Sequence, residues 1–90
     1  MPEMLSDVER VLRLSERMRL LVAVSEEIPV ESKLNAEAML KMFEAAVAAA
    51  DDPADRARAS GYYRVLYRDL EPYADLEALL SAMRVFAPYL

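Results

Sequence analysis

The chain has 90 residues, of which 56% are hydrophobic and 30% are charged, and its net charge at neutral pH is −5. This length supports one modest core, and the composition excludes a disordered polar chain. The lack of cysteine and histidine excludes disulfides, sulfur-ligated metal sites and the commonest general base.

Strand signals are missing from the sequence. Glycine occurs once, at Gly61, and there is no alternating β-branched run and no Asn-Gly or Asp-Gly turn. With so few flexible joints, the loops must be short. The pattern predicts an all-α fold, a compact four-helix up-down bundle that forms a single domain over residues 1–90. Helices are predicted at about 6–26, 35–50, 53–70 and 75–87.

The first predicted helix begins at Ser6, because Ser6 and Glu9 have the spacing of a reciprocal capping box. Arg19 projects into the apolar face of this helix. Its side chain either snorkels to water at the edge of the bundle or pairs with a carboxylate such as Glu44 or Asp69.

Two apolar residues of this helix, Leu20 and Val24, fall on its charged side. Either the loop that follows or a partner would cover them. Pro29 marks the end of the helix, because the residue before a proline is disfavoured in the helical region. Either Ser32 or Asn35 is expected to cap the next helix.

The second predicted helix is apolar over most of its circumference. Ordinary surface helices hide one apolar stripe, so a helix of this kind expects neighbours on several sides. It is therefore predicted to be the central helix, with Leu40 and Phe43 in the core. A second, smaller apolar face of the same helix consists of Leu34, Ala38, Met42, Ala45 and Ala49.

The sequence Asp51-Asp52-Pro53 predicts a tight connection, since Asp52 can cap the third helix and Pro53 fits its first position. Pro72 ends that helix, and Asp75 is expected to cap the fourth. The second and third helices would form a hairpin, and a close backbone approach would explain a helical glycine that costs roughly 1 kcal/mol relative to alanine. The small residues expected in this contact are Ala45, Ala46, Ala49, Ala54, Ala57 and Gly61.

The outer face of the third helix combines arginine with tyrosine. Residues 53–70 contain four arginines and two aspartates, so this segment is net positive in an acidic chain. Tyrosine and arginine are enriched at protein-interface hot spots. We expect this face to bind a protein partner, and the alternative is that its tyrosines are half-buried at the helix boundary. The predicted residues are Tyr63, Tyr67, Arg56, Arg64, Arg68 and Ser60. The second choice is Leu34, Ala38 and Met42 of the second helix.

No spacing in the sequence indicates catalysis. The serines have no partner base, and the adjacent acids Glu26-Glu27 and Asp51-Asp52 are interpreted as caps and helix-end charges. The sequence has no phosphate-binding loop, EF-hand loop or zinc spacing. We therefore expect no enzymatic activity, no cofactor and no metal site.

The sequence has neither the charged region nor the apolar core of a signal peptide. No apolar run approaches the ~20 residues that cross a bilayer, and the negative charge argues against non-specific binding to nucleic acid. These features predict a soluble protein, cytoplasmic or recombinant, that is a monomer or a weak homo-oligomer. Its expected partner is a protein, not a membrane or a nucleic acid.

The whole chain shares several features of style. It has clean helix caps, connections made of acidic residues and proline such as Asp51-Asp52-Pro53, and helices rich in alanine, and it lacks cysteine, histidine and tryptophan. In these features it resembles a de novo designed helical mini-protein binder. The resemblance implies a protein target, a rigid fold and no catalysis. Two lysines against nine arginines, and six methionines, depart from that style. Two alternatives stay open: a small natural inhibitor or adaptor of phage or bacterial type, and a purely structural bundle without a partner.

Overall fold

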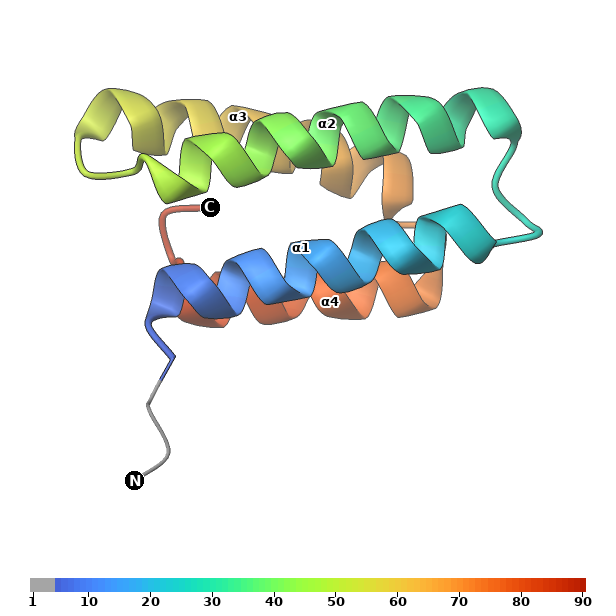
Figure 1. The fold of residues 1–90 in the computed structure, drawn as a ribbon, viewed down its shortest axis with the longest axis horizontal. Helices are drawn as coiled ribbons and strands as arrows, with labels where there is room; N and C mark the ends of the chain where they lie inside the picture. Colours follow the sequence, from blue (N-terminus) through green and yellow to red (C-terminus); the bar gives the residue numbers. More distant parts are fainter. Residues whose placement is uncertain (1–4) are drawn as a thin grey trace.

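The computed structural model describes residues 5–90, so residues 1–4 of the predicted domain lie outside the described residues. The described chain is all-α, with four helices joined by short loops (Figure 1). The predicted fold class, a compact four-helix up-down bundle, is confirmed. The helices are α1 (Asp7–Val24), α2 (Val30–Ala48), α3 (Pro53–Leu70) and α4 (Ala74–Phe86).

The helices pack in two layers. α2 lies beside α3, α1 lies beside α4, and α1 also packs against α2 (Figure 1). After α4 the chain turns back between the two layers, where Ala87 and Leu90 are buried. The C-terminal residues therefore complete the core at the end of the bundle where α1 begins.

Two helices begin as the sequence predicts. The Ser6 hydroxyl accepts a hydrogen bond from the backbone N–H of Glu9 at 3.1 Å and donates one to its carboxylate at 3.2 Å. Asp52 accepts a hydrogen bond from the backbone N–H of Asp55 at 2.9 Å, and Pro53 occupies the first helical position. That backbone hydrogen bond lowers the pKa of the Asp52 carboxyl.

The predicted start of α2 is wrong. The helix begins at Val30, directly after Pro29, and neither Ser32 nor Asn35 caps it. Pro29 has no N–H to leave unpaired, and its carbonyl accepts the first helical hydrogen bond, from the N–H of Lys33. The start of α4 also differs. Tyr73 is the capping residue, and the predicted cap Asp75 lies inside the first turn.

The core centres on α2 and α3. Leu40 and Phe43 are completely buried, which confirms their predicted place. The Phe43 ring packs against the ring of Tyr63, with 6.2 Å between their centroids. Aromatic pairs at this separation add to the stability gained by burying their surface. The contact joins α2 directly to α3.

The predicted contact through small residues in the α2–α3 hairpin is wrong. Ala46 is buried, but Ala45, Ala49 and Ala57 are exposed, and a Cβ atom added at Gly61 would meet no atom within 4 Å. The residue that α3 buries in their place is Ala59, with the larger stripe of Tyr63, Leu66 and Leu70. The difference is a rotation of α3 about its axis, which leaves Gly61 on the surface.

Candidate binding surface

Tyr63, the centre of the predicted binding face, does not lie on the surface. It is fully buried, and its hydroxyl donates a 2.6 Å hydrogen bond to the carbonyl oxygen of Leu80 in α4. Burial raises the pKa of the Tyr63 phenol. The prediction that Tyr63 is a partner-contacting residue is therefore wrong, because its aromatic ring is part of the core.

Tyr67 is half-buried at the boundary between α3 and α4. Its hydroxyl donates a 2.8 Å hydrogen bond to Glu77, whose carboxylate also accepts one from Ser81 at 2.8 Å. The bond to Glu77 raises the pKa of the Tyr67 phenol, and the same bond lowers the pKa of the Glu77 carboxyl. The Arg84 guanidinium lies 5.9 Å from the centre of the Tyr67 ring. These contacts fix Tyr67 within the bundle.

The other four predicted residues follow one another at a spacing of four along α3, but their surroundings differ. Arg56 folds back, with its Nε donating to the carbonyl of Ala50 and its guanidinium 5.7 Å from the centre of the Tyr89 ring. Ser60 is half-buried, whereas Arg64 and Arg68 are exposed. The row is therefore polar, because Tyr63 is part of the core and Tyr67 is bonded to Glu77.

The second-choice residues lie together on the surface. Leu34 is 62% exposed and Met42 is 45% exposed, with exposed Ala38 between them. Val30, which is 71% exposed, continues the row at the same spacing of four residues. Residues four apart form a ridge along a helix. We call Val30, Leu34, Ala38 and Met42 the α2 ridge.

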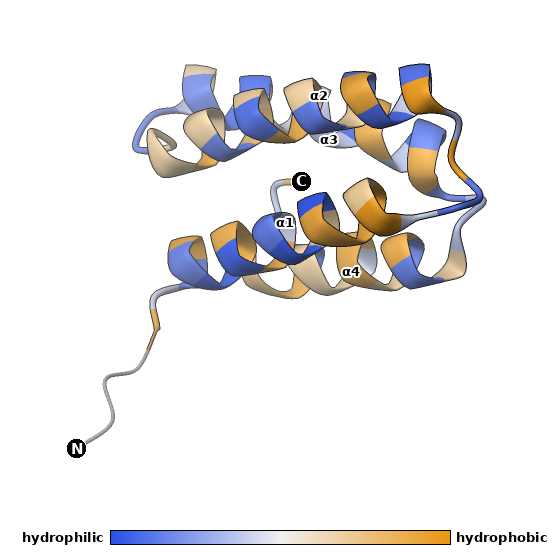
Figure 2. Ribbon diagram, turned by 45° about the vertical axis from the view of Figure 1, so that its right-hand side comes forward, coloured by the Kyte–Doolittle hydropathy of each residue, from blue (hydrophilic) through white to orange (hydrophobic). Residues whose placement is uncertain are grey.

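The α2 ridge is bordered by α1 on one side. Leu20 is 65% exposed and Val24 is 74% exposed, so the expectation that the α1–α2 loop covers them is wrong. Figure 2 shows hydrophobic residues along α2 and at the end of α1 that leads into it. Between these helices runs a shallow groove, lined by Glu16, Arg19, Leu20, Ala23, Glu37 and Lys41.

On its other side the α2 ridge runs into the surface shared with α3. Met42 borders a shallow hollow, and the aromatic ring of Tyr62 lines the opposite wall. Arg58 also lines this hollow, 3.6 Å from the carboxylate of Asp55. The rest of the lining consists of small α2 side chains, Ala45, Ala46 and Ala49. The hollow is therefore shallow, and its floor is apolar.

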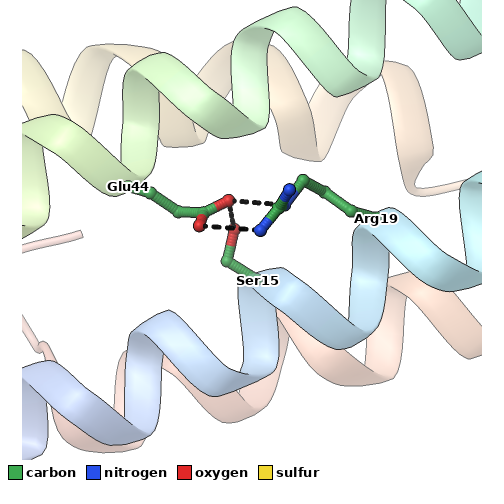
Figure 3. A network of polar contacts seen from close by, with 3 residues as sticks. All are labelled: Ser15, Arg19 and Glu44. Carbon is green, nitrogen blue, oxygen red and sulfur yellow. Dashed lines mark hydrogen bonds and ion pairs between the residues drawn. The ribbon is translucent and has the colours of Figure 1, made fainter.

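A polar cluster of three residues holds α1 against α2. The Arg19 Nε lies 2.9 Å from the Glu44 carboxylate, and the buried Ser15 hydroxyl donates a 3.0 Å hydrogen bond to the same group (Figure 3). Arg19 is one-third exposed, so it both reaches the bundle edge and pairs with Glu44. The carboxylate is occupied by these contacts, which indicates a structural role.

From the sequence, the outer face of α3 was predicted to be the binding surface, and the apolar row of α2 was the second choice. The signal for the α2 ridge was available, because its four residues recur at a spacing of four and Lys41 is a rare charge beside them. The apolar circumference of the helix also predicted neighbours within the chain on several of its sides. In the structure, α1 and α3 contact the two flanks of α2 and leave its outer face open.

No family model, no curated protein and no solved structure matches the chain. Among residues 5–90, no group of three or more acidic side chains is arranged to hold a metal ion. Within the same residues, none of the helices combines the length and apolar character needed to cross a membrane.

Proposed function

We propose that this domain is a protein-binding module that takes up a helix of a partner protein along the α2 ridge. One observation carries the proposal: three large apolar side chains, Val30, Leu34 and Met42, are exposed in one row on the helix, with exposed Ala38 between the last two. A surface helix normally presents charged residues at such positions. Contiguous exposed apolar rows of this kind mark interaction sites.

The form of the α2 ridge favours a helical partner. Its four residues span about 18 Å at the helical rise of 1.5 Å per residue. Side chains spaced by four form ridges that fit the grooves of another helix. The shallow grooves on both flanks of α2 give the neighbouring ridges of a partner helix room to settle. A flat sheet or an extended peptide would leave these grooves unfilled.

The binding surface proposed here lies on α2 and not on the outer face of α3, but the class of function, protein binding, is the one expected from the sequence. Buried Tyr63 cannot supply a hot spot without unfolding the core, and Tyr67 is held by Glu77. A protein target is also what the resemblance to designed mini-protein binders implies. A natural inhibitor or adaptor would use the same apolar face to occlude its partner.

A library of displayed 20-residue helical peptides tests the proposal. Each peptide carries an apolar stripe at helical spacing and random residues elsewhere, and the library is selected for binding to the protein. The affinity of the best peptide is then measured by fluorescence anisotropy. Leu34→Glu and Met42→Glu should each weaken binding by at least about tenfold, because either carboxylate would be desolvated in the contact.

Val85→Glu is the matched control. Val85 is 74% exposed on α4, so the same charge is added to an exposed apolar position away from α2, and binding should not change. Equal binding by all three variants would contradict the proposal. Loss only in Arg64→Glu would move the site to the outer face of α3. A library that yields no binder would favour a purely structural bundle.

A further inference from the structure

On the basis of the proposed function, we infer that the partner helix is basic in the turn that lies over the α1–α2 connection. Three exposed glutamates lie at the end of the bundle where α2 begins: Glu31 is in the first turn of α2, and Glu26 and Glu27 are in the connection, where they line a hollow with the start of α4. Among residues 5–90, none of the three belongs to an ion pair. Their charges therefore face the solvent within a few residues of Val30 in the chain.

The nearest basic residue of α2 does not neutralise this acidic end. Lys33 is half-buried, and its ammonium group donates a hydrogen bond to the backbone carbonyl of Ala23 at 3.3 Å. Three carboxylates against one ammonium group leave this end of the ridge negative. Lysine or arginine residues of a partner would complement that charge, guide its approach and fix its register.

The same charges make a second copy of this chain a poorer occupant. In an antiparallel pair of α2 helices, the acidic end of one copy would meet the region after Ala49 of the other, where Asp51 and Asp52 are exposed. In a parallel pair, each acidic end would meet itself. Both arrangements bring like charges together, which is costly at an interface.

Charge also predicts the direction of the partner helix. Basic side chains are most favourable in the last turn of a helix, where they interact with its negative dipole end. A partner with lysine or arginine in its last turn would place that turn over Glu26, Glu27 and Glu31. Its first turn would then lie toward Met42 and the α2–α3 hollow. The partner helix therefore runs antiparallel to α2.

The library described above also tests this inference, because the charges in its terminal turns are random. We expect selected peptides to be enriched in lysine and arginine in the last turn. For one such peptide, the on-rate should fall about tenfold in the double variant Glu27→Lys/Glu31→Lys at low salt and become insensitive to salt. A synthetic peptide with its basic residues moved to the first turn should bind more slowly to the parent protein.

The double variant Asp7→Lys/Asp51→Lys changes the net charge equally at the opposite end of the bundle (Figure 1). It should reduce the on-rate less than the first double variant does. Equal reductions of the on-rate by the two double variants, or selected peptides with no basic bias, would overturn the inference. The proposed function would still stand in that case if Leu34→Glu abolished binding. If sedimentation of the free chain shows a dimer that Leu34→Glu dissociates, the occupant is a second copy and the inference is wrong.

Discussion

The hydroxyl of Tyr63 in α3 donates a hydrogen bond of 2.6 Å to the backbone carbonyl of Leu80 in α4. Both residues are completely buried. The bond joins α3 to α4, as the bond between Tyr67 and Glu77 also does, and it satisfies the only polar atom of the buried Tyr63 side chain. Tyr63 therefore belongs to the core through its ring and to the α3–α4 contact through its hydroxyl.

Removing this hydroxyl should destabilise the fold moderately. We expect Tyr63→Phe to lower the free energy of unfolding by about 1 kcal/mol, the usual net worth of a hydrogen bond. Tyr63→Ala should cost about 3–5 kcal/mol, because it also leaves a cavity beside Phe43. Urea unfolding followed by circular dichroism measures both effects. Arg64→Ala, one residue away on the surface, should leave the midpoint unchanged; a similar loss there would contradict the buried role of Tyr63.

Alkaline pH should unfold the protein through the same residues. Burial raises the pKa of the Tyr63 and Tyr89 phenols, and the hydrogen bond to Glu77 raises that of Tyr67. A raised pKa in the folded state means that the unfolded chain loses these protons first, near the usual value of about 10. The stabilising contribution is complete below that pH and is lost as the pH rises through the folded-state values.

Thermal unfolding at a series of pH values tests this expectation. The melting temperature should be constant between about pH 7 and 9 and fall steeply above about pH 10. Tyr63→Phe should start from a lower melting temperature but show a shallower alkaline fall. An equally steep fall in that variant would show that Tyr63 does not contribute to it.

The order of the helices and much of the core were predictable from the sequence. The start of α3 follows from Asp52 and Pro53, whose effects are local and depend on no other helix. Leu40 and Phe43 follow from the apolar periodicity of α2. Such features depend on residues only a few positions apart, so the sequence contains all that is needed to predict them.

The orientation of α3 was harder to predict, although Ala59, Tyr63, Leu66 and Leu70 have core spacing. Tyrosine suits a surface as well as a core, and the Leu80 carbonyl that satisfies its hydroxyl is 17 positions away in the chain. The same holds for Arg19, because Glu44 and Asp69 were equal candidates until the packing of α1 against α2 selected Glu44. Contacts between helices depend on their relative rotation, which periodicity alone does not determine.

Gly61 gives a prediction opposite to the one that the hairpin interpretation implies. Because a Cβ atom at this position would meet no atom within 4 Å, Gly61→Ala should stabilise the fold by about 0.5–1 kcal/mol through helix propensity. The measurement is the urea midpoint. Ala57→Gly, one turn earlier on the same exposed face, is the matched control and should lower stability by a similar amount. A loss of stability in Gly61→Ala would instead support the close contact between the second and third helices that the sequence predicted.

The cluster of Ser15, Arg19 and Glu44 allows the energetics of a partly buried ion pair to be tested. Glu44→Leu should cost about 1–3 kcal/mol, because the fully buried Ser15 hydroxyl loses its partner and the Arg19 Nε, already buried without a well-aligned hydrogen bond, loses its counter-charge. Adding Ser15→Ala and Arg19→Met removes both orphaned groups. The triple variant should therefore recover most of the stability that Glu44→Leu loses, because apolar replacement of buried ion pairs is often neutral or stabilising.

Urea unfolding of the single, double and triple variants gives the coupling free energy directly, because the three residues contact one another and their effects should not add. We expect the sum of the three single losses to exceed the loss in the triple variant by at least about 1 kcal/mol. Additive losses would mean that water already satisfies each group and that the cluster does not hold α1 to α2. A triple variant that is as stable as the parent would instead show that the cluster contributes little net stability. Its value would then lie in selecting the rotation of α1 against α2, and that rotation leaves Leu20 exposed beside the α2 ridge.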